Sequence, residues 1–209
     1  KFPKKTIVQK KNRNFWFDDG KINASYNCIQ KNILEKKNKK IALYFITTKS
    51  EIQSINYEQL SILVDNFLYF LKTKFEKKIK KIIIHSSASI ECAVRMLSCA
   101  KLGITHNVIF EDLESEAINK RIYLFKPDLI ISRTNTYKFK KNFNKKNTGK
   151  INTIFFQNDN ERKYKNSISI NDFRDGNLNN PKTKYKKINS NYPFFVLFTS
   201  GSTGVPKGV

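Results

Sequence analysis

Hydrophobic residues in this chain form two kinds of run, short unbroken ones and longer ones with the spacing of a helix face. The short runs are rich in isoleucine, valine and phenylalanine, a composition that favours buried strands. They predict strands at residues 41–46, 81–85, 105–110, 128–132, 151–156 and 194–198. The stretches 138–150 and 158–191 carry few apolar residues and many lysines and asparagines, so they are expected to be surface connections.

Helical spacing begins shortly after the first of these strands. Asn56 can cap a helix, with Gln59 at the capping-box position. The residues that follow repeat at i, i+3, i+4 and i+7, as on the buried face of an amphipathic helix. This apolar stripe consists of Leu60, Leu63, Val64, Phe67, Leu68 and Leu71. The residues before the cap, 49–54, are expected to form a polar turn.

Two further helices are expected between the strands. One begins at a cap residue, Ser87 or Ser89, and stops at Gly103. Its core-facing side is expected at Ala93, Met96, Leu97 and Ala100. The other spans residues 114–125 and ends before Pro127. Strands separated by helices of this size form right-handed βαβ units and a parallel sheet, so the predicted fold class is α/β. Ligands are then expected beyond the carboxyl ends of the strands.

The charge of the chain is strongly positive. It has 40 lysine and arginine residues against 17 aspartate and glutamate residues, a formal net charge of +23 at pH 7. Such a charge suggests a nucleic-acid-binding module as one function class. Nearly all of the excess is lysine, however, whereas arginine is the residue that makes bidentate contacts with phosphates and bases. Lysine also accompanies abundant asparagine, isoleucine and phenylalanine, a joint bias that an AT-rich coding sequence produces. We therefore expect no specific nucleic-acid partner.

Cysteine and histidine carry little chemistry in this sequence. Cys28, Cys92 and Cys99 form no C-x-x-C pair and no cluster with histidine, so no metal site is expected. Cys92 and Cys99 lie on one face of a predicted helix and are expected in the core. His106, at the start of a strand, is expected to be structural. Unpaired cysteines suit a reducing, cytoplasmic compartment, and no apolar run is long enough to cross a membrane.

A loop of small residues follows the strand predicted at 194–198. It consists of Thr199, Ser200, Gly201, Ser202, Thr203 and Gly204. Such a loop can turn its backbone N–H groups and hydroxyls toward an anion, and its glycines let a phosphate approach the backbone. Lys207 then provides a mobile positive charge, suited to charge that builds up on a phosphoryl group. The spacing differs from the P-loop of kinases and GTPases, in which the lysine directly follows a glycine.

Three stretches resemble a known superfamily. The run Thr-Ser-Gly-Ser-Thr-Gly-Val-Pro-Lys-Gly at 199–208 is similar to the phosphate loop of the adenylate-forming enzymes, which include acyl-CoA synthetases, luciferases and peptide-synthetase adenylation domains. Residues 16–27 resemble an amino-terminal arm of acetyl-CoA and propionyl-CoA synthetases that luciferases lack. Residues 89–110 resemble a helix and strand of the same synthetases. The resemblance divides the chain into an arm, residues 1–38, and the amino-terminal part of an AMP-binding domain, residues 39–209, incomplete at its carboxyl end.

The resemblance implies an AMP-forming acid–thiol ligase. ATP and acetate or propionate would give an acyl-adenylate and pyrophosphate, and coenzyme A would then form the thioester. The loop residues Thr199 to Gly204 would hold the ATP phosphates, Mg²⁺ would share their charge, and Lys207 would be catalytic. The partners would be these small molecules. The 209 residues alone are expected to be inactive, because the family's adenine contacts, acyl pocket and hinge come later in sequence. The choice of acetate or propionate and the oligomeric state stay open.

The chain departs from the family pattern near the expected coenzyme A site. Glu111, Asp112 and Leu113 replace a Gly-Gly-Phe sequence, which puts two carboxylates where an anionic nucleotide would pass. Lys138 and Lys141 align with two arginines that hold the coenzyme's phosphate in the acetyl branch. A truncated or decayed, inactive relative of the synthetases is therefore an alternative function, and a lysine-rich nucleic-acid-binding module is a second.

Overall fold

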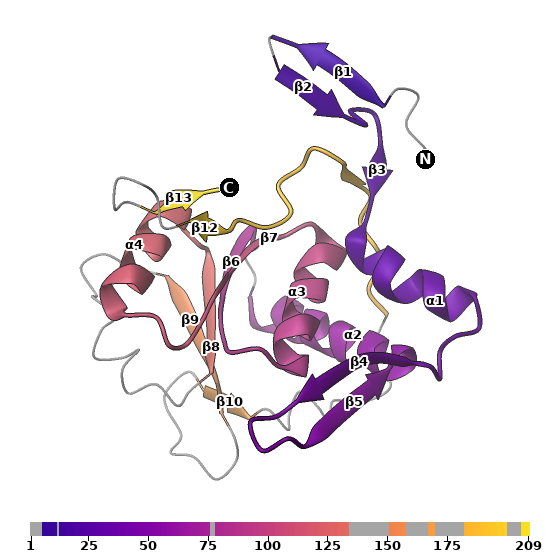
Figure 1. Ribbon diagram of the computed structural model, residues 1–209, viewed down its shortest axis with the longest axis vertical. Helices are drawn as coiled ribbons and strands as arrows, with labels where there is room; N and C mark the ends of the chain where they lie inside the picture. Colours follow the sequence, from indigo (N-terminus) through magenta and orange to yellow (C-terminus); the bar gives the residue numbers. More distant parts are fainter. Residues whose placement is uncertain are drawn as a thin grey trace.

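A five-stranded parallel sheet forms the centre of the molecule (Figure 1). The computed structural model describes residues 6–11, 13–75, 78–133, 151–157, 167–169, 182–199 and 206–209. The strand order is β10-β9-β8-β6-β7, and every neighbouring pair is parallel. The strands are β6 (Lys81–His85), β7 (Thr105–Ile109), β8 (Leu129–Arg133), β9 (Asn152–Gln157) and β10 (Ser167–Ser169). The predicted α/β fold is confirmed, and the strands predicted at 81–85, 105–110, 128–132 and 151–156 agree with β6 to β9 within one residue.

Helices cover both faces of this sheet. Helices α2 (Tyr57–Lys74) and α3 (Ile90–Leu102) pack on one face, and α4 (Ser115–Phe125) packs on the other. Ile82 and Ile84 of β6 belong to the core on the α2 and α3 side, whereas Ile83 belongs to the core under α4. Because both faces are buried, β6 contains an unbroken run of isoleucine rather than alternating polar and apolar residues.

Helix α2 follows its sequence prediction. The Asn56 side chain accepts a hydrogen bond from the backbone N–H of Gln59, and the Gln59 side chain accepts one from the N–H of Asn56. The expected capping box is thus confirmed. Its predicted stripe faces the core, with five residues buried and Leu63 partly buried. The buried members are Leu60, Val64, Phe67, Leu68 and Leu71.

Helix α3 begins and ends as expected but buries a different face. The Ser89 side chain accepts a hydrogen bond from the N–H of Cys92, and Gly103 ends the helix with a φ of 68°. The predicted core face is wrong, because Met96 is 37% exposed and only Ala100 of the four residues is buried. Helix α3 packs against both α2 and the sheet, so it buries polar residues as well as apolar ones. The buried residues are Ile90, Cys92, Val94, Arg95, Ser98, Cys99, Ala100 and Lys101.

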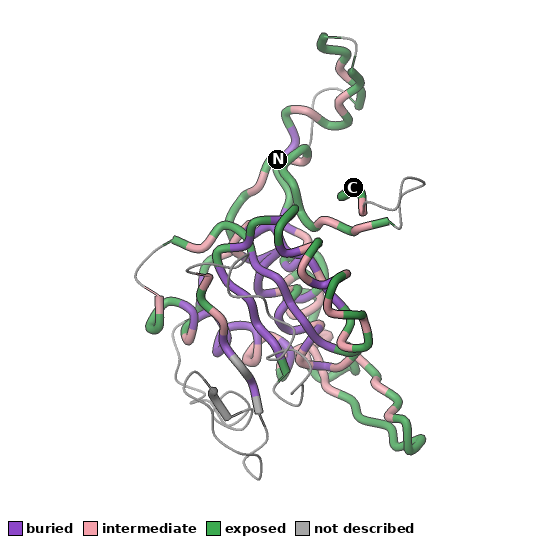
Figure 2. Tube along the Cα trace, turned by 90° about the vertical axis from the view of Figure 1, so that its left-hand side faces the viewer, coloured by how far each residue is buried: buried purple, intermediate pink, exposed green. Residues whose placement is uncertain are grey.

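Two of the antiparallel hairpins outside the parallel sheet lie in the first 56 residues. Strands β1 (Ile7–Lys10) and β2 (Arg13–Trp16) form one, and β4 (Ile41–Ile46) and β5 (Ile52–Asn56) form the other. The polar turn predicted at 49–54 is wrong, because β5 starts at Ile52 and the chain reverses over residues 47–51. Figure 2 shows that burial is concentrated in the central sheet and its helices, whereas the β1–β2 hairpin is largely exposed.

Asn23 joins the amino-terminal arm to the rest of the molecule. It follows β3 (Lys21–Ile22), which pairs with β11 (Ile188–Asn189), and precedes η1 (Tyr26–Gln30) and α1 (Lys31–Leu34). Its buried side-chain amide donates hydrogen bonds to the carbonyl oxygens of Ala100, Lys101 and Lys186, at 2.9, 3.1 and 2.8 Å. One side chain therefore links the arm, the end of α3 and the connection that leads toward the carboxyl terminus.

A buried ion pair fixes the same connection to the helices. The ammonium group of Lys101 lies 2.8 Å from the carboxylate of Asp65, and both side chains are almost fully buried. The carboxylate also accepts a hydrogen bond from the backbone N–H of Thr183, and the ammonium group lies 4.2 Å from the ring centroid of Tyr185. The pair thus ties α2, α3 and the segment 182–192 together.

Removing one partner of this pair should strongly destabilise the fold. Asp65→Ala leaves the Lys101 ammonium group buried without its counter-charge, which costs about 3–5 kcal/mol in comparable cases. Urea unfolding of Asp65→Ala, and of the double variant Asp65→Ala with Lys101→Met, measures this cost. We expect the double variant to be more stable than the single one, because it removes both charges. An equal loss in Asp65→Ala and in Glu58→Ala, which breaks the exposed pair with Lys39, would contradict this role.

Candidate functional site

The segment 194–199 brings the loop of small residues to the carboxyl side of the sheet. It runs parallel to β7: the N–H of His106 donates to the carbonyl of Phe194 at 3.4 Å, and the N–H of Val196 donates to the carbonyl of His106 at 2.9 Å. Val196 and Phe198 face the core under α4. Thr199 is therefore placed beyond the edge strand, where a parallel sheet binds its ligands.

The prediction that 194–198 is a buried strand is wrong. Phe194, Phe195 and Leu197 are 42%, 44% and 53% exposed. The reason is that Val196 and Phe198 pack against the core under α4, whereas Phe195 and Leu197 project from the opposite face of the segment. Only alternate residues therefore reach the core. His106 of β7 is fully buried, and its ring packs edge-on against that of Phe194, with 5.4 Å between the ring centroids. This packing is in keeping with a structural role.

A short hairpin closes the predicted phosphate loop. Strands β12 (Phe198–Thr199) and β13 (Lys207–Gly208) are antiparallel, and Thr199 stands opposite Lys207. Backbone hydrogen bonds between Leu197 and Val209, at 2.8 and 2.9 Å, extend the pairing, and the Thr199 hydroxyl donates to the Lys207 carbonyl at 3.4 Å. Residues 200–205 connect the two strands.

The register of the β12–β13 hairpin fixes the relative orientation of two predicted site residues. Opposite residues of an antiparallel pair project from the same face, so the side chains of Thr199 and Lys207 share one side of the hairpin. Lys207 is exposed, so its ammonium group is accessible to an anion. The other predicted loop residues, Ser200, Gly201, Ser202, Thr203 and Gly204, lie outside the described residues, as do Lys138 and Lys141.

A pair of polar side chains marks the switch point of the sheet. The chain leaves β6 toward β7 and leaves β8 toward β9, in opposite directions, so the carboxyl ends of β6 and β8 flank a crevice. There His85 Nδ1 and Ser132 Oγ are 2.8 Å apart, and both residues are buried. Burial lowers the pKa of His85 to about 4, so the imidazole is neutral near pH 7. The sequence offered one signal for this pair, a polar residue at the end of each apolar strand.

A carboxylate bridges the ends of β6 and β7. The Ser87 hydroxyl donates a hydrogen bond to Glu111 at 2.8 Å, and Glu111 is partly buried, whereas Asp112 is exposed. Glu111 is therefore held in place beside the switch point rather than free to turn into solvent. This is the position at which the sequence departs from the adenylate-forming pattern.

A buried cation lies near these strand ends. Arg95 of α3 is 2% exposed, and its guanidinium carbon lies 4.6 Å from the ring centroid of Phe156 on β9. Burial lowers the pKa of Arg95 to about 10, so the group stays positively charged at neutral pH. Burial also raises the pKa of the neighbouring Cys92, which keeps the thiol protonated and a poor nucleophile. The sequence pattern did not identify Arg95; its signal was a single arginine within a mostly apolar helix.

The part of the chain that the structure describes contains neither a metal-binding cluster nor a membrane-spanning helix. Within these ranges no three histidine, cysteine, aspartate or glutamate side chains gather as a metal site would require. None of the described helices has the length and apolar composition that crossing a membrane demands.

Comparisons of the sequence agree with the resemblance. The family model described as AMP-binding enzyme matches residues 30–209. The chain is 31% identical over 207 residues to the acetyl-coenzyme A synthetase of Helicobacter pylori (strain P12), which covers 93% of this chain. It is 32% identical over 213 residues to the acetyl-coenzyme A synthetase of Methylobacillus flagellatus, with the same coverage. In both cases the chain spans 31% of the length of the relative.

Solved structures agree on the fold. The acetoacetyl-CoA synthetase of Streptomyces lividans superposes on 100% of this chain and 33% of its own, with a TM-score of 0.83 and 12% identity. An acyl-CoA synthetase of Brucella canis superposes on 92% of this chain and 33% of its own, with a TM-score of 0.74 and 15% identity. These likenesses extend over most of the chain, including the sheet and its helices.

The buried histidines predict how stability depends on pH. Burial lowers the pKa of His85 and of His106 to about 4, from 6.5. Above pH 6.5 their contribution to stability is complete. Below it the unfolded chain binds protons that the folded chain does not, so the free energy of unfolding falls as pH approaches 4. Between pH 6.5 and 5 we expect a loss of about 2 kcal/mol for each histidine.

Urea unfolding across this pH range checks the prediction. The variant His85→Asn cannot titrate and should lose about half of the pH dependence. A slope unchanged in both His85→Asn and His106→Asn would show that the imidazoles are not kept neutral by the fold.

Proposed function

The chain belongs to the AMP-binding enzyme family, and we propose that it forms the amino-terminal part of an AMP-forming acyl-CoA synthetase. In this reaction a short carboxylate attacks the α-phosphorus of ATP to give an acyl-adenylate and pyrophosphate. The thiol of coenzyme A then attacks the acyl carbon and releases AMP. The observation that carries the proposal is the β12–β13 hairpin, which sets Thr199 opposite Lys207 at the ligand-binding side of the sheet.

The hairpin suits a role in binding the ATP phosphates. The register of β12 and β13 fixes both ends of the loop, so less entropy is lost when the loop closes on an anion. Lys207 is exposed and can follow charge as it moves toward the departing pyrophosphate. Mg²⁺ would arrive with the nucleotide, held mainly by phosphate oxygens and water, as is usual for this ion.

Acetate is the first substrate to test and propionate the second. The two relatives compared above are named acetyl-coenzyme A synthetase, and the chain is about 31–32% identical to them. ATP and coenzyme A would be the co-substrates, and a cytoplasmic setting would provide both. The chain spans 31% of the length of these relatives, so we expect the 209 residues alone to form no AMP. Activity is therefore to be measured in the complete protein that contains them.

A second candidate function is that of an inactive relative. The observation that favours it is Glu111, a carboxylate fixed by Ser87 beside the switch point where the resembling family has glycine. A negative charge held there opposes the approach of an anionic coenzyme. This candidate predicts a protein that adenylates slowly or not at all, or that adenylates without forming a thioester.

Lys207→Ala should slow adenylate formation far more than it weakens ATP binding. The ammonium group is most useful where charge develops in the transition state, so kcat should fall by roughly 10²–10³-fold with little change in the Kd for ATP. Exchange of labelled pyrophosphate into ATP, dependent on acetate, measures the step. Lys49→Ala, an exposed lysine on the turn of the β4–β5 hairpin, is the matched control. An unchanged exchange rate in Lys207→Ala would remove this residue from the reaction.

Restoring glycine at Glu111 and Asp112 should separate the two half-reactions. If coenzyme A passes over this surface, Glu111→Gly with Asp112→Gly should speed thioester formation and leave pyrophosphate exchange unchanged. The control is Glu51→Gly, which removes an exposed carboxylate from the β4–β5 turn. Equal effects on both half-reactions, or none on either, would show that the coenzyme does not use this surface.

A further inference from the structure

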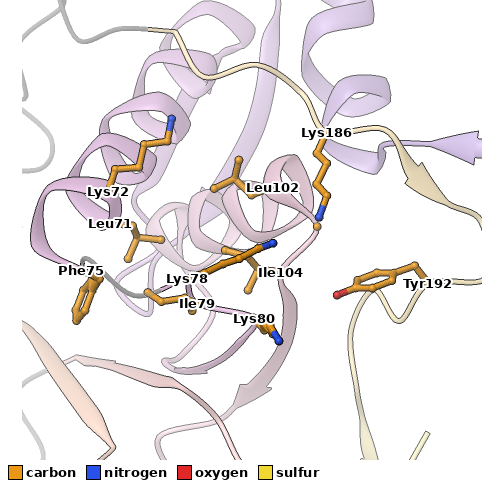
Figure 3. Close-up of a pocket in the computed structure, with 11 residues that line it drawn as sticks. Leu71, Lys72, Phe75, Lys78, Ile79, Lys80, Leu102, Ile104, Lys186 and Tyr192 are labelled. Carbon is orange, nitrogen blue, oxygen red and sulfur yellow. The ribbon is translucent and has the colours of Figure 1, made fainter.

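A second concave site lies at the opposite edge of the sheet, where the strands begin. It has a volume of about 600 Å³, within the range of roughly 300–1,000 Å³ that is typical of small-molecule sites (Figure 3). It is lined by Lys80, which directly precedes β6, and by Ile104, which directly precedes β7. The ends of α2 and α3 form further walls. The β12–β13 hairpin leaves the sheet at its carboxyl edge, so the two sites are separate.

The inner wall of this pocket is apolar. Leu71 and Ile104 are buried at its base, and Phe75 and Leu102 are partly buried beside them. Figure 3 shows Leu71, Leu102 and Ile104 between the last turn of α2 and the end of α3, with Phe75 at the end of α2. Such a surface gains free energy when a ligand covers its apolar groups.

Four lysines surround the apolar wall. Lys72, Lys78, Lys80 and Lys186 are all exposed, and none forms an ion pair with a carboxylate of a described residue. The ammonium group of Lys72 donates to the Thr183 hydroxyl at 3.5 Å. Elsewhere in the described part of the chain, most lysine ammonium groups that form a hydrogen bond do so with a carboxylate, as at Lys39 and Lys120.

The helix ends nearby do not neutralise this charge. Helices α2 and α3 both finish at the pocket, and each carboxyl end carries about half a negative charge. Together they offset about one of the four positive charges. Asp128, whose carboxylate accepts hydrogen bonds from the backbone N–H groups of Lys80 and Lys81, offsets about one more. A net positive potential is left at the mouth, which attracts anions.

The far wall is held in place. Lys186 and Tyr192 come from the segment 182–192, and the N–H of Lys186 donates to the Lys101 carbonyl at 3.0 Å. The Lys186 carbonyl accepts a hydrogen bond from the amide of Asn23 at 2.8 Å. A ligand would therefore meet a preformed wall and would have little backbone to order.

We propose that this pocket binds a small organic anion that carries an apolar group, such as an alkyl chain with a phosphate or carboxylate head. The apolar part covers Leu71, Leu102 and Ile104, and the head lies between the ammonium groups of Lys78 and Lys186, which point toward one another in Figure 3. The proposal is independent of the proposed ligase function, because it uses neither the phosphate-loop hairpin nor the switch point.

Calorimetric titration of the 209-residue chain, or of the complete protein that contains it, tests the proposal. Octyl phosphate, used as a monomer below its micelle concentration, should bind at least tenfold more tightly than inorganic phosphate. Octyltrimethylammonium should not bind. The variant Lys78→Glu with Lys186→Glu should weaken octyl phosphate binding at least tenfold. The matched control Lys49→Glu, which reverses an exposed charge on the β4–β5 turn, should change it less than threefold.

Methyl signals provide a test that needs no variant. On addition of octyl phosphate, those of Leu71, Leu102 and Ile104 should shift, whereas those of Ile118 on α4 should not. Equal binding of inorganic phosphate, equal weakening by Lys49→Glu, or shifts spread equally to Ile118 would overturn the proposal. So would binding only to vesicles that contain an anionic lipid, because that result would assign the lysines to a membrane surface.

Discussion

The two-sided burial of β6 is the constraint on which the rest of the structure depends. Ile82, Ile83 and Ile84 are fully buried, and their side chains point alternately to the two faces of the sheet. Helices must therefore cover both faces, and parallel strands joined by crossover helices satisfy this requirement. Because the five strands are parallel, their carboxyl ends all lie at the same edge of the sheet. The switch-point pair, the Glu111 bridge and the β12–β13 hairpin all gather on that side of the sheet.

The segment 182–192, which leads toward the β12–β13 hairpin, is attached to the rest of the molecule by polar contacts rather than by apolar burial. The segment 182–192 carries few apolar residues, and it is held by the Asp65–Lys101 pair, by Asn23 and by the short β3–β11 pairing. A buried charge pair is costly to form but strict in geometry, because each group needs its partner at the right place. The path toward Thr199 is thus fixed at its start by specific partners and near its end by β7.

Sequence patterns predicted the strands β6 to β9, the capping box of α2 and both ends of α3, because each depends on local spacing and on a few residue types. The face of α3 could not be predicted, since Lys101 and Ser98 are buried only because Asp65 and two backbone carbonyls receive them. The exposure of Phe195 depends on which face of its segment is covered by the core under α4, a tertiary property. At the site, Thr199 and Lys207 followed from a motif, whereas Arg95 and the His85–Ser132 pair required the fold to bring distant residues together.

We propose that the complete protein containing this chain activates a carboxylate as an acyl-adenylate. Transfer of ¹⁸O from labelled acetate, or propionate, tests it most directly in the complete protein supplied with ATP, Mg²⁺ and coenzyme A. An acyl-adenylate joins a carboxylate oxygen to the α-phosphorus, so release of the acyl group to coenzyme A must leave one ¹⁸O atom in AMP. We predict one labelled oxygen per AMP formed. Label in inorganic phosphate instead, or AMP formed without label, would contradict the account.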